Sequence, residues 1–135
     1  MNNTSTLKTS RQERYLKAVE LLDSAHSYTR LGAVHALVAL ADEYLADQAL
    51  QAEERHTEGQ RIVDVLCAYI RTPFELAFRY DELSQDKPSP HGSYRENYQE
   101  FSVHRAELLA EAKVRQRALQ EIHRRLRHFP QGDRR

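Results

Sequence analysis

Apolar residues recur at helical spacing in four stretches of the chain, and no stretch alternates apolar and polar residues as a strand would. In the first stretch, residues 11–23, Tyr15, Val19 and Leu22 share one helix face. The small, polar residues 1–10 predict a flexible N-terminal arm before it. The pattern therefore favours an all-α protein whose first helix starts near residue 11.

A second helix, capped by Ser27 or Thr29, is predicted to run to about Ala46, and it is the most apolar of the four. Within Leu31–Ala41 only Gly32 and His35 are not apolar, which is typical of a central, buried helix. We expect His35 to lie in the core or at its boundary with its hydrogen bonds satisfied. Glycine costs up to about 1 kcal/mol relative to alanine inside a helix, and we expect close helix packing at Gly32 to compensate.

A third helix is predicted over residues 57–71, with Ile62 and Leu66 on its apolar face. Cys67 lies in the same apolar run and is interpreted as a small core residue. The helix is expected to end before Pro73, because the residue preceding proline disfavours helical geometry.

The fourth helix is predicted to start at Tyr94 or Glu100 and to end at Phe129, before Pro130. Residues 72–100 then form an insertion before this last helix, and residues 130–135 a flexible tail. Its expected apolar stripe consists of Leu108, Ala112, Leu119, Ile122, Leu126 and Phe129.

A short internal similarity relates the second and fourth helices. In each, an arginine is followed by alanine three residues later and by a large aliphatic residue after four more. Two helical hairpins of this kind, stacked on each other, are the unit of α-solenoids. The two copies are Arg30, Ala33 and Leu37, and Arg115, Ala118 and Ile122.

Five segments together resemble a HEAT-like helical module of actinobacterial proteins of unknown function. The segments are Arg14–Leu22, Thr29–Leu37, Leu40–Glu43, Val63–Phe74 and Val114–Leu119. That module commonly follows membrane-spanning helices and in some relatives precedes pentapeptide repeats. The resemblance implies two antiparallel helical hairpins, and it implies a cytoplasmic part of a membrane-associated protein or a stand-alone copy.

Composition is consistent with a single charge-rich globular domain over residues 11–129. The 135 residues contain 20 basic and 20 acidic side chains, so the net charge is zero. A single cysteine excludes an internal disulfide and favours a reducing compartment. We expect the chain to be cytoplasmic, with no cofactor.

No catalytic set and no metal-binding set stand out among the polar residues. The closest histidine pair, His123 and His128, is five residues apart, which does not place both on one helix face. Asp64 interrupts the third helix, and it either faces solvent or pairs with an arginine. Arg30 and Arg115, at equivalent repeat positions, are the expected partners, and we favour this structural ion pair.

The insertion and its borders are rich in aromatic residues. One interpretation is a small cluster that pins the insertion onto the helices. The other is a surface that binds a protein partner, because tyrosine and phenylalanine concentrate at interface hot spots. The candidate residues are Phe74, Phe78, Tyr80, Tyr94, Tyr98 and Phe101.

Charge is unevenly distributed along the chain. Residues 113–135 hold eight basic and two acidic side chains, a net of +6, so residues 1–112 carry −6. The basic helix either complements the acidic segment 42–58, in the same chain or a second copy, or binds anionic lipid headgroups or nucleic acid. Nucleic acid is the weaker option because no base-reading motif accompanies the arginines. The candidate anion-binding residues are Arg117, Arg124, Arg125 and Arg127.

These patterns predict a non-enzymatic scaffold that binds a protein partner or forms a homo-oligomer. It would serve as the cytosolic domain of a membrane-associated protein, attached through segments outside this chain. The alternative is a binder of anionic surfaces that uses the basic last helix.

Overall fold

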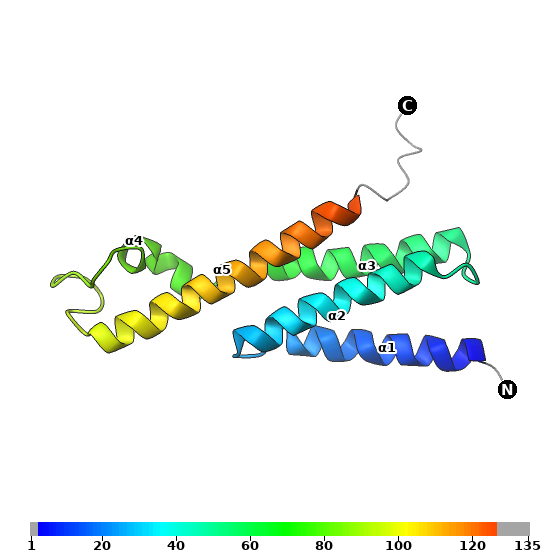
Figure 1. Cartoon of the computed structure of the whole chain (residues 1–135), viewed down its shortest axis with the longest axis horizontal. Coiled ribbons are helices and arrows are strands. Elements are labelled where there is room, and N and C mark those ends of the chain that lie inside the picture. The colour runs from blue at the N-terminus through cyan, green and yellow to red at the C-terminus, as the bar shows by residue number, and fades with distance from the viewer. Residues whose placement is uncertain (1–2, 127–135) are drawn as a thin grey trace, which may run out of the picture.

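The computed structural model describes residues 3–126, with side chains from Ser5 onward, and over this range it is all-helical with no strand. The predicted all-α class is therefore confirmed. The long helices are connected by short turns, except for the segment before the last helix (Figure 1). The elements are α1 (Asn3–Leu21), α2 (Ser27–Ala46), α3 (Ala52–Arg71), the 3₁₀ turn η1 (Glu75–Arg79), α4 (Tyr80–Leu83) and α5 (Tyr98–Leu126).

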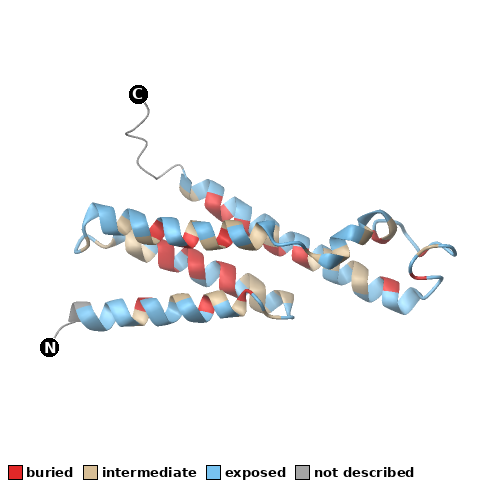
Figure 2. Ribbon diagram, turned by 180° about the vertical axis from the view of Figure 1, so that it is seen from behind, coloured by how far each residue is buried: buried red, intermediate tan, exposed pale blue. Residues whose placement is uncertain are grey.

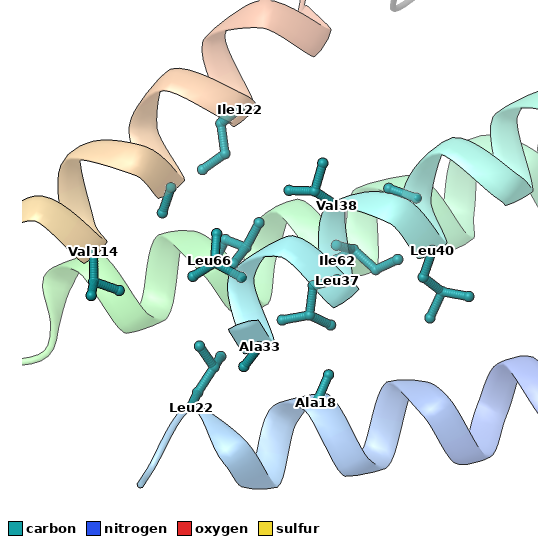
Figure 3. Close-up of a cluster of buried hydrophobic side chains, with 13 residues drawn as sticks. Ala18, Leu22, Ala33, Leu37, Val38, Leu40, Ile62, Leu66, Val114 and Ile122 are labelled. Carbon is teal, nitrogen blue, oxygen red and sulfur yellow. The ribbon is translucent and has the colours of Figure 1, made fainter. Parts of the chain in front are cut away.

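Helix α2 is the centre of the fold, as its apolar sequence predicts. It packs against α1 on one side and against α3 and α5 on the others (Figure 1). Ala33, Val34 and Leu37 on α2 are fully buried and meet side chains from all three neighbours, among them Ala18, Leu66 and Ala118 (Figure 3 shows most of these residues). The main core is thus built around one apolar helix that touches the other three long helices.

One face of α2 nevertheless remains open to solvent. Gly32, His35, Ala36 and Ala39 follow the three- and four-residue steps of one helix face, and all are exposed. The expectations that His35 lies in the core or at its boundary and that Gly32 supports close packing are therefore wrong. A short apolar run could not reveal this face, because exposed alanines are as apolar as buried ones.

The core-facing side of α5 also differs from the prediction. Ala112, Leu119 and Leu126 are exposed, and Phe129 lies outside the described residues. The carboxylates of Glu111 and Glu121 occupy core-facing positions instead, and a pattern of apolar residues does not reveal them. The residues that α5 buries are Phe101, Glu111, Val114, Ala118, Glu121 and Ile122.

Two helices begin earlier than predicted. Helix α1 already includes residues 3–10, which the sequence pattern placed before the first helix. Helix α3 begins at Ala52 rather than near residue 57, because Glu53 and Glu54 favour the positive end of the helix dipole in its first turn. Helix α5 starts at Tyr98, within the predicted interval, and the tail 130–135 lies outside the described residues.

A separate small lobe lies at the N-terminal end of α5. Here η1, α4 and the loop before α5 fold back against that helix, away from α1 and α2 (Figure 1). Leu83, Tyr94 and Phe101 form its own small core, with Leu76 and Leu108 packed against them. Figure 2 shows these few buried positions apart from the main core.

The open face of α2 yields a direct prediction for Gly32. No atom lies within 4 Å of the position that a Cβ would take, and the backbone there is ordinary helix. We expect Gly32→Ala to raise the free energy of unfolding in urea by about 0.5–1 kcal/mol, through helix propensity. A loss of stability would contradict an open face at this position.

Candidate functional site

The most constrained polar group in the protein is the carboxylate of Glu111 on α5. Glu111 is only 2% exposed, and its carboxylate accepts three short hydrogen bonds. Arg30 Nε of α2 donates to Oε1 at 2.8 Å, and Arg115 Nε and the Tyr69 hydroxyl donate to Oε2 at 2.7 and 2.6 Å. One buried carboxylate thus links α2, α3 and α5.

The two arginines extend this link to the ends of the helices. Arg30 Nη1 donates to the carbonyl of Ser24 in the α1–α2 turn at 2.7 Å, and Arg115 Nη1 donates to the carbonyl of Ile70 at 2.9 Å. The Arg115 guanidinium also lies over the Tyr69 ring. Burial and the bond to Glu111 raise the pKa of Tyr69 to about 12, so the hydroxyl keeps its proton at neutral pH. We call Arg30, Tyr69, Glu111 and Arg115 the Glu111 cluster.

The predicted ion pair therefore forms with a different carboxylate. Asp64 is exposed and accepts a hydrogen bond from Gln60 on its own helix at 2.9 Å. Arg30 and Arg115 do share a carboxylate, as their repeat positions suggested, but that carboxylate is Glu111. The sequence does not distinguish Glu111, because it lies four residues before Arg115 on the same helix, where the two resemble an ordinary surface ion pair.

A second set of ion pairs joins α2 to its neighbours. Arg125 of α5 bonds both oxygens of Asp42 at 2.8 Å and also bonds Glu121. On the other side of α2, the buried Arg11 of α1 bonds Asp47 at 2.7 Å, and Arg14 bonds Glu43. The pKa values of Glu43, Asp47 and Glu121 are lowered, mainly by these hydrogen bonds.

For Arg125, these ion pairs favour pairing with the acidic segment over binding of external anions. Arg125 is engaged within the chain by part of the acidic segment, so it is not available as an anion-binding residue. Arg117 and Arg124 approach Glu121 at 4.0 and 3.3 Å but remain largely exposed. Arg127 lies outside the described residues.

The solvent face of α5 has a consistent character from residue 109 to residue 126. Glu111 and Glu121, the two acids in this range, are both buried. The exposed charges are therefore all basic, and at about 100° of rotation per residue they lie along one edge of the exposed surface, with Leu119 and Leu126 along the opposite edge. We call this surface the basic–leucine face, and it consists of Leu109, Lys113, Arg117, Leu119, Arg124 and Leu126.

The six candidate aromatic residues separate into three groups by burial. Tyr94 and Phe101 are buried in the lobe, where their rings meet edge to face and the Tyr94 hydroxyl bonds His104 Nδ1 at 2.8 Å. Phe74 is half-buried beside Arg115. The other three project into solvent with large exposed fractions: Phe78 at 82%, Tyr80 at 61% and Tyr98 at 57%.

A groove between α1 and α3 is a feature that the sequence did not indicate. One cleft of about 660 Å³ lies between the N-terminal halves of the two helices, with Tyr15 and Tyr44 in its wall. A second, of about 360 Å³, lies between their C-terminal ends and reaches the Glu111 cluster. The lining residues of both clefts share one face of each helix, and Arg61 of the larger cleft stacks on the Tyr15 ring.

Comparison with family models, curated proteins and solved structures found no match, so the site residues stand on the geometry alone. In the part of the chain that the structure describes, no group of three or more His, Cys, Asp or Glu residues is placed to hold a metal ion. Within residues 3–126 no helix has the length and apolar character needed to cross a membrane.

The Glu111 cluster predicts a large difference between two similar substitutions. Glu111→Ala leaves two arginines without their carboxylate, and we expect it to lower the free energy of unfolding by about 3–5 kcal/mol. Asp64→Ala, the matched control, removes an exposed carboxylate and should change stability by less than about 0.5 kcal/mol. Urea unfolding followed by circular dichroism measures both, and equal effects would contradict the assignment.

Proposed function

We propose that this protein is a non-enzymatic interaction module that binds a protein partner through the aromatic lobe. The observation that carries this proposal is the exposure of Phe78, Tyr80 and Tyr98 on one small lobe. Aromatic side chains of this size bury much apolar area at little conformational cost, which makes them frequent anchors at interfaces.

The lobe supports this role because it presents these side chains from a fixed base. Glu82 of α4 accepts hydrogen bonds from both the backbone and the hydroxyl of Ser93, which holds the loop against α4. Arg105 of α5 donates to the carbonyl of Gln85 at 2.9 Å. A surface whose backbone is already ordered loses less entropy on binding.

The finer architecture and the cellular setting belong to the same proposal. We infer a HEAT-like pair of hairpins, because the repeat residues Ala33 and Ala118 are both fully buried and Arg30 and Arg115 bind one carboxylate. The inferred setting is cytoplasmic, at the membrane face if segments outside this chain attach it. The partner is a different protein or a second copy.

The aromatic lobe is tested by replacing its exposed rings together. Phe78→Ser, Tyr80→Ser and Tyr98→Ser should reduce partner recovery in affinity capture from the source organism by about tenfold or more, the loss typical of hot-spot residues. Tyr28→Ser is the matched control, since Tyr28 is an exposed aromatic residue on α2. Equal recovery by the triple variant and the control would overturn the proposal, as would a failure to capture any partner.

The basic–leucine face favours a second candidate function, attachment to anionic lipid surfaces. Lysine and arginine side chains along one edge of this face are attracted to acidic headgroups, while Leu119 and Leu126 along the other edge offer apolar area to the headgroup boundary. No acid is exposed between residues 109 and 126 to oppose this attraction.

Vesicle sedimentation tests this second function. We expect binding to phosphatidylcholine vesicles with about 30% phosphatidylglycerol, loss of binding at high salt, and no binding to pure phosphatidylcholine. Arg117→Glu with Arg124→Glu should abolish it, whereas Arg95→Glu, an exposed arginine of the lobe, should leave it unchanged. Binding that is insensitive to salt or to the first pair of substitutions would exclude this function.

A further inference from the structure

We propose that the smaller cleft between α1 and α3 binds a carboxylate on an apolar molecule, with Arg30 and Arg115 as the receiving groups. The cleft has a volume of about 360 Å³, within the range of small-ligand sites. This site is independent of the lobe and of the basic–leucine face, so it does not rest on the functions proposed above.

The arginines at the base of the cleft have donors to spare. Each uses Nε on Glu111 and Nη1 on a backbone carbonyl. Arg30 also interacts with the Tyr69 side chain, whereas Arg115 Nη2 has no hydrogen bond to any residue that the structure describes. No buried side-chain polar atom in this range lacks a partner, so the Arg115 Nη2 group reaches solvent. Two preorganised guanidinium groups facing one cleft are a geometry that suits a carboxylate.

The charge of the cluster favours an anion. Two guanidinium groups and the single carboxylate of Glu111 leave +1 in a largely buried setting, with the arginine side chains only 13% and 22% exposed. Asp23 is on the lining of the cleft, but it is exposed and bonds neither arginine through its side chain. An added carboxylate would complete the neutralisation of the cluster.

The apolar walls of the cleft indicate the chemical character of the part of the ligand that carries the carboxylate. Val19 and Leu22 of α1 face Val65 and Ala68 of α3 across the cleft, and Phe74 lies at its end. These side chains offer no polar partner, so they suit an aliphatic or aromatic body attached to the carboxylate.

The larger cleft lacks this combination. Arg11 there is already bonded to Glu43 and Asp47, and Arg61 lies beside Glu58. Glu54 and Glu58 also line that cleft. Its arginines are therefore neutralised locally, and an anion would meet acidic side chains.

Titration with octanoate, followed by calorimetry and by backbone amide shifts, tests the site. We expect binding that shifts amides around residues 19–24 and 65–74, and binding of neutral octanamide weaker by about tenfold or more, because it lacks the charge that the arginines receive. No binding at about 10 mM octanoate, near the weakest affinities of interest, would overturn the proposal, as would equal binding of octanamide.

Cavity filling separates the cleft from the stability of the Glu111 cluster. Ala68→Phe occupies the cleft from an exposed helical position and should weaken octanoate binding by about tenfold or more, with the fold retained. Ala112→Phe, at an exposed position on α5, is the matched control and should bind as the wild type does. Unchanged binding in Ala68→Phe would contradict the site.

A peptide pair identifies the source of the carboxylate. Acetyl-Ala-Ala-Leu with a free C-terminus is compared with the same peptide as its amide. Tighter binding of the free acid than of octanoate supports the site as a receptor for a protein C-terminus. Weaker binding supports it as a site for a small organic acid. Equal binding of acid and amide overturns the requirement for a carboxylate.

Discussion

The buried carboxylate of Glu111 is the constraint on which the arrangement of the helices depends. Two arginines and a tyrosine converge on it, and the same arginines hold the α1–α2 turn and the C-terminal end of α3 through backbone carbonyls. Apolar packing around α2 supplies most of the stabilisation, but packing alone tolerates sliding of one helix along another. Directional bonds to one buried charged group set the position of α5 relative to α2 and α3, because any shift leaves a charge unpaired.

Helix class and the central place of α2 follow from periodicity alone, because a helix apolar on most of its sides must be covered on most of them. The core face of α5 does not follow, since Glu111 and Glu121 occupy it and Leu119 and Leu126 do not. A carboxylate can be buried only where basic side chains neutralise it, and one of the partners of Glu111, Arg30, lies 81 residues away in the sequence. A pattern of apolar positions contains no information about such a partner. The repeat of Arg30 and Arg115 was the one sequence signal that pointed to the cluster, although it indicated the wrong acid.

Internal ion pairs account for part of the uneven charge distribution along the chain. Asp42 and Glu43 of α2, and Asp47 just after it, bind arginines of α5 and α1. Among the charges left exposed are Lys113 on α5 and Arg117 and Arg124, which Glu121 pairs only at their exposed ends. The cationic Glu111 cluster reaches the smaller cleft. The features proposed to bind partners, lipids or ligands are thus those that the internal pairing leaves open, together with the aromatic side chains of the lobe.

A double-mutant cycle on Arg30 and Arg115 tests most directly whether one carboxylate ties the helices together. The free energies of unfolding of Arg30→Met, Arg115→Met and the double variant are measured in urea and compared with that of the wild type. If both arginines act through Glu111, the two effects are coupled, and their sum differs from the effect of the double variant by more than about 1 kcal/mol. Additivity within about 0.5 kcal/mol would show two independent contacts and would contradict the account.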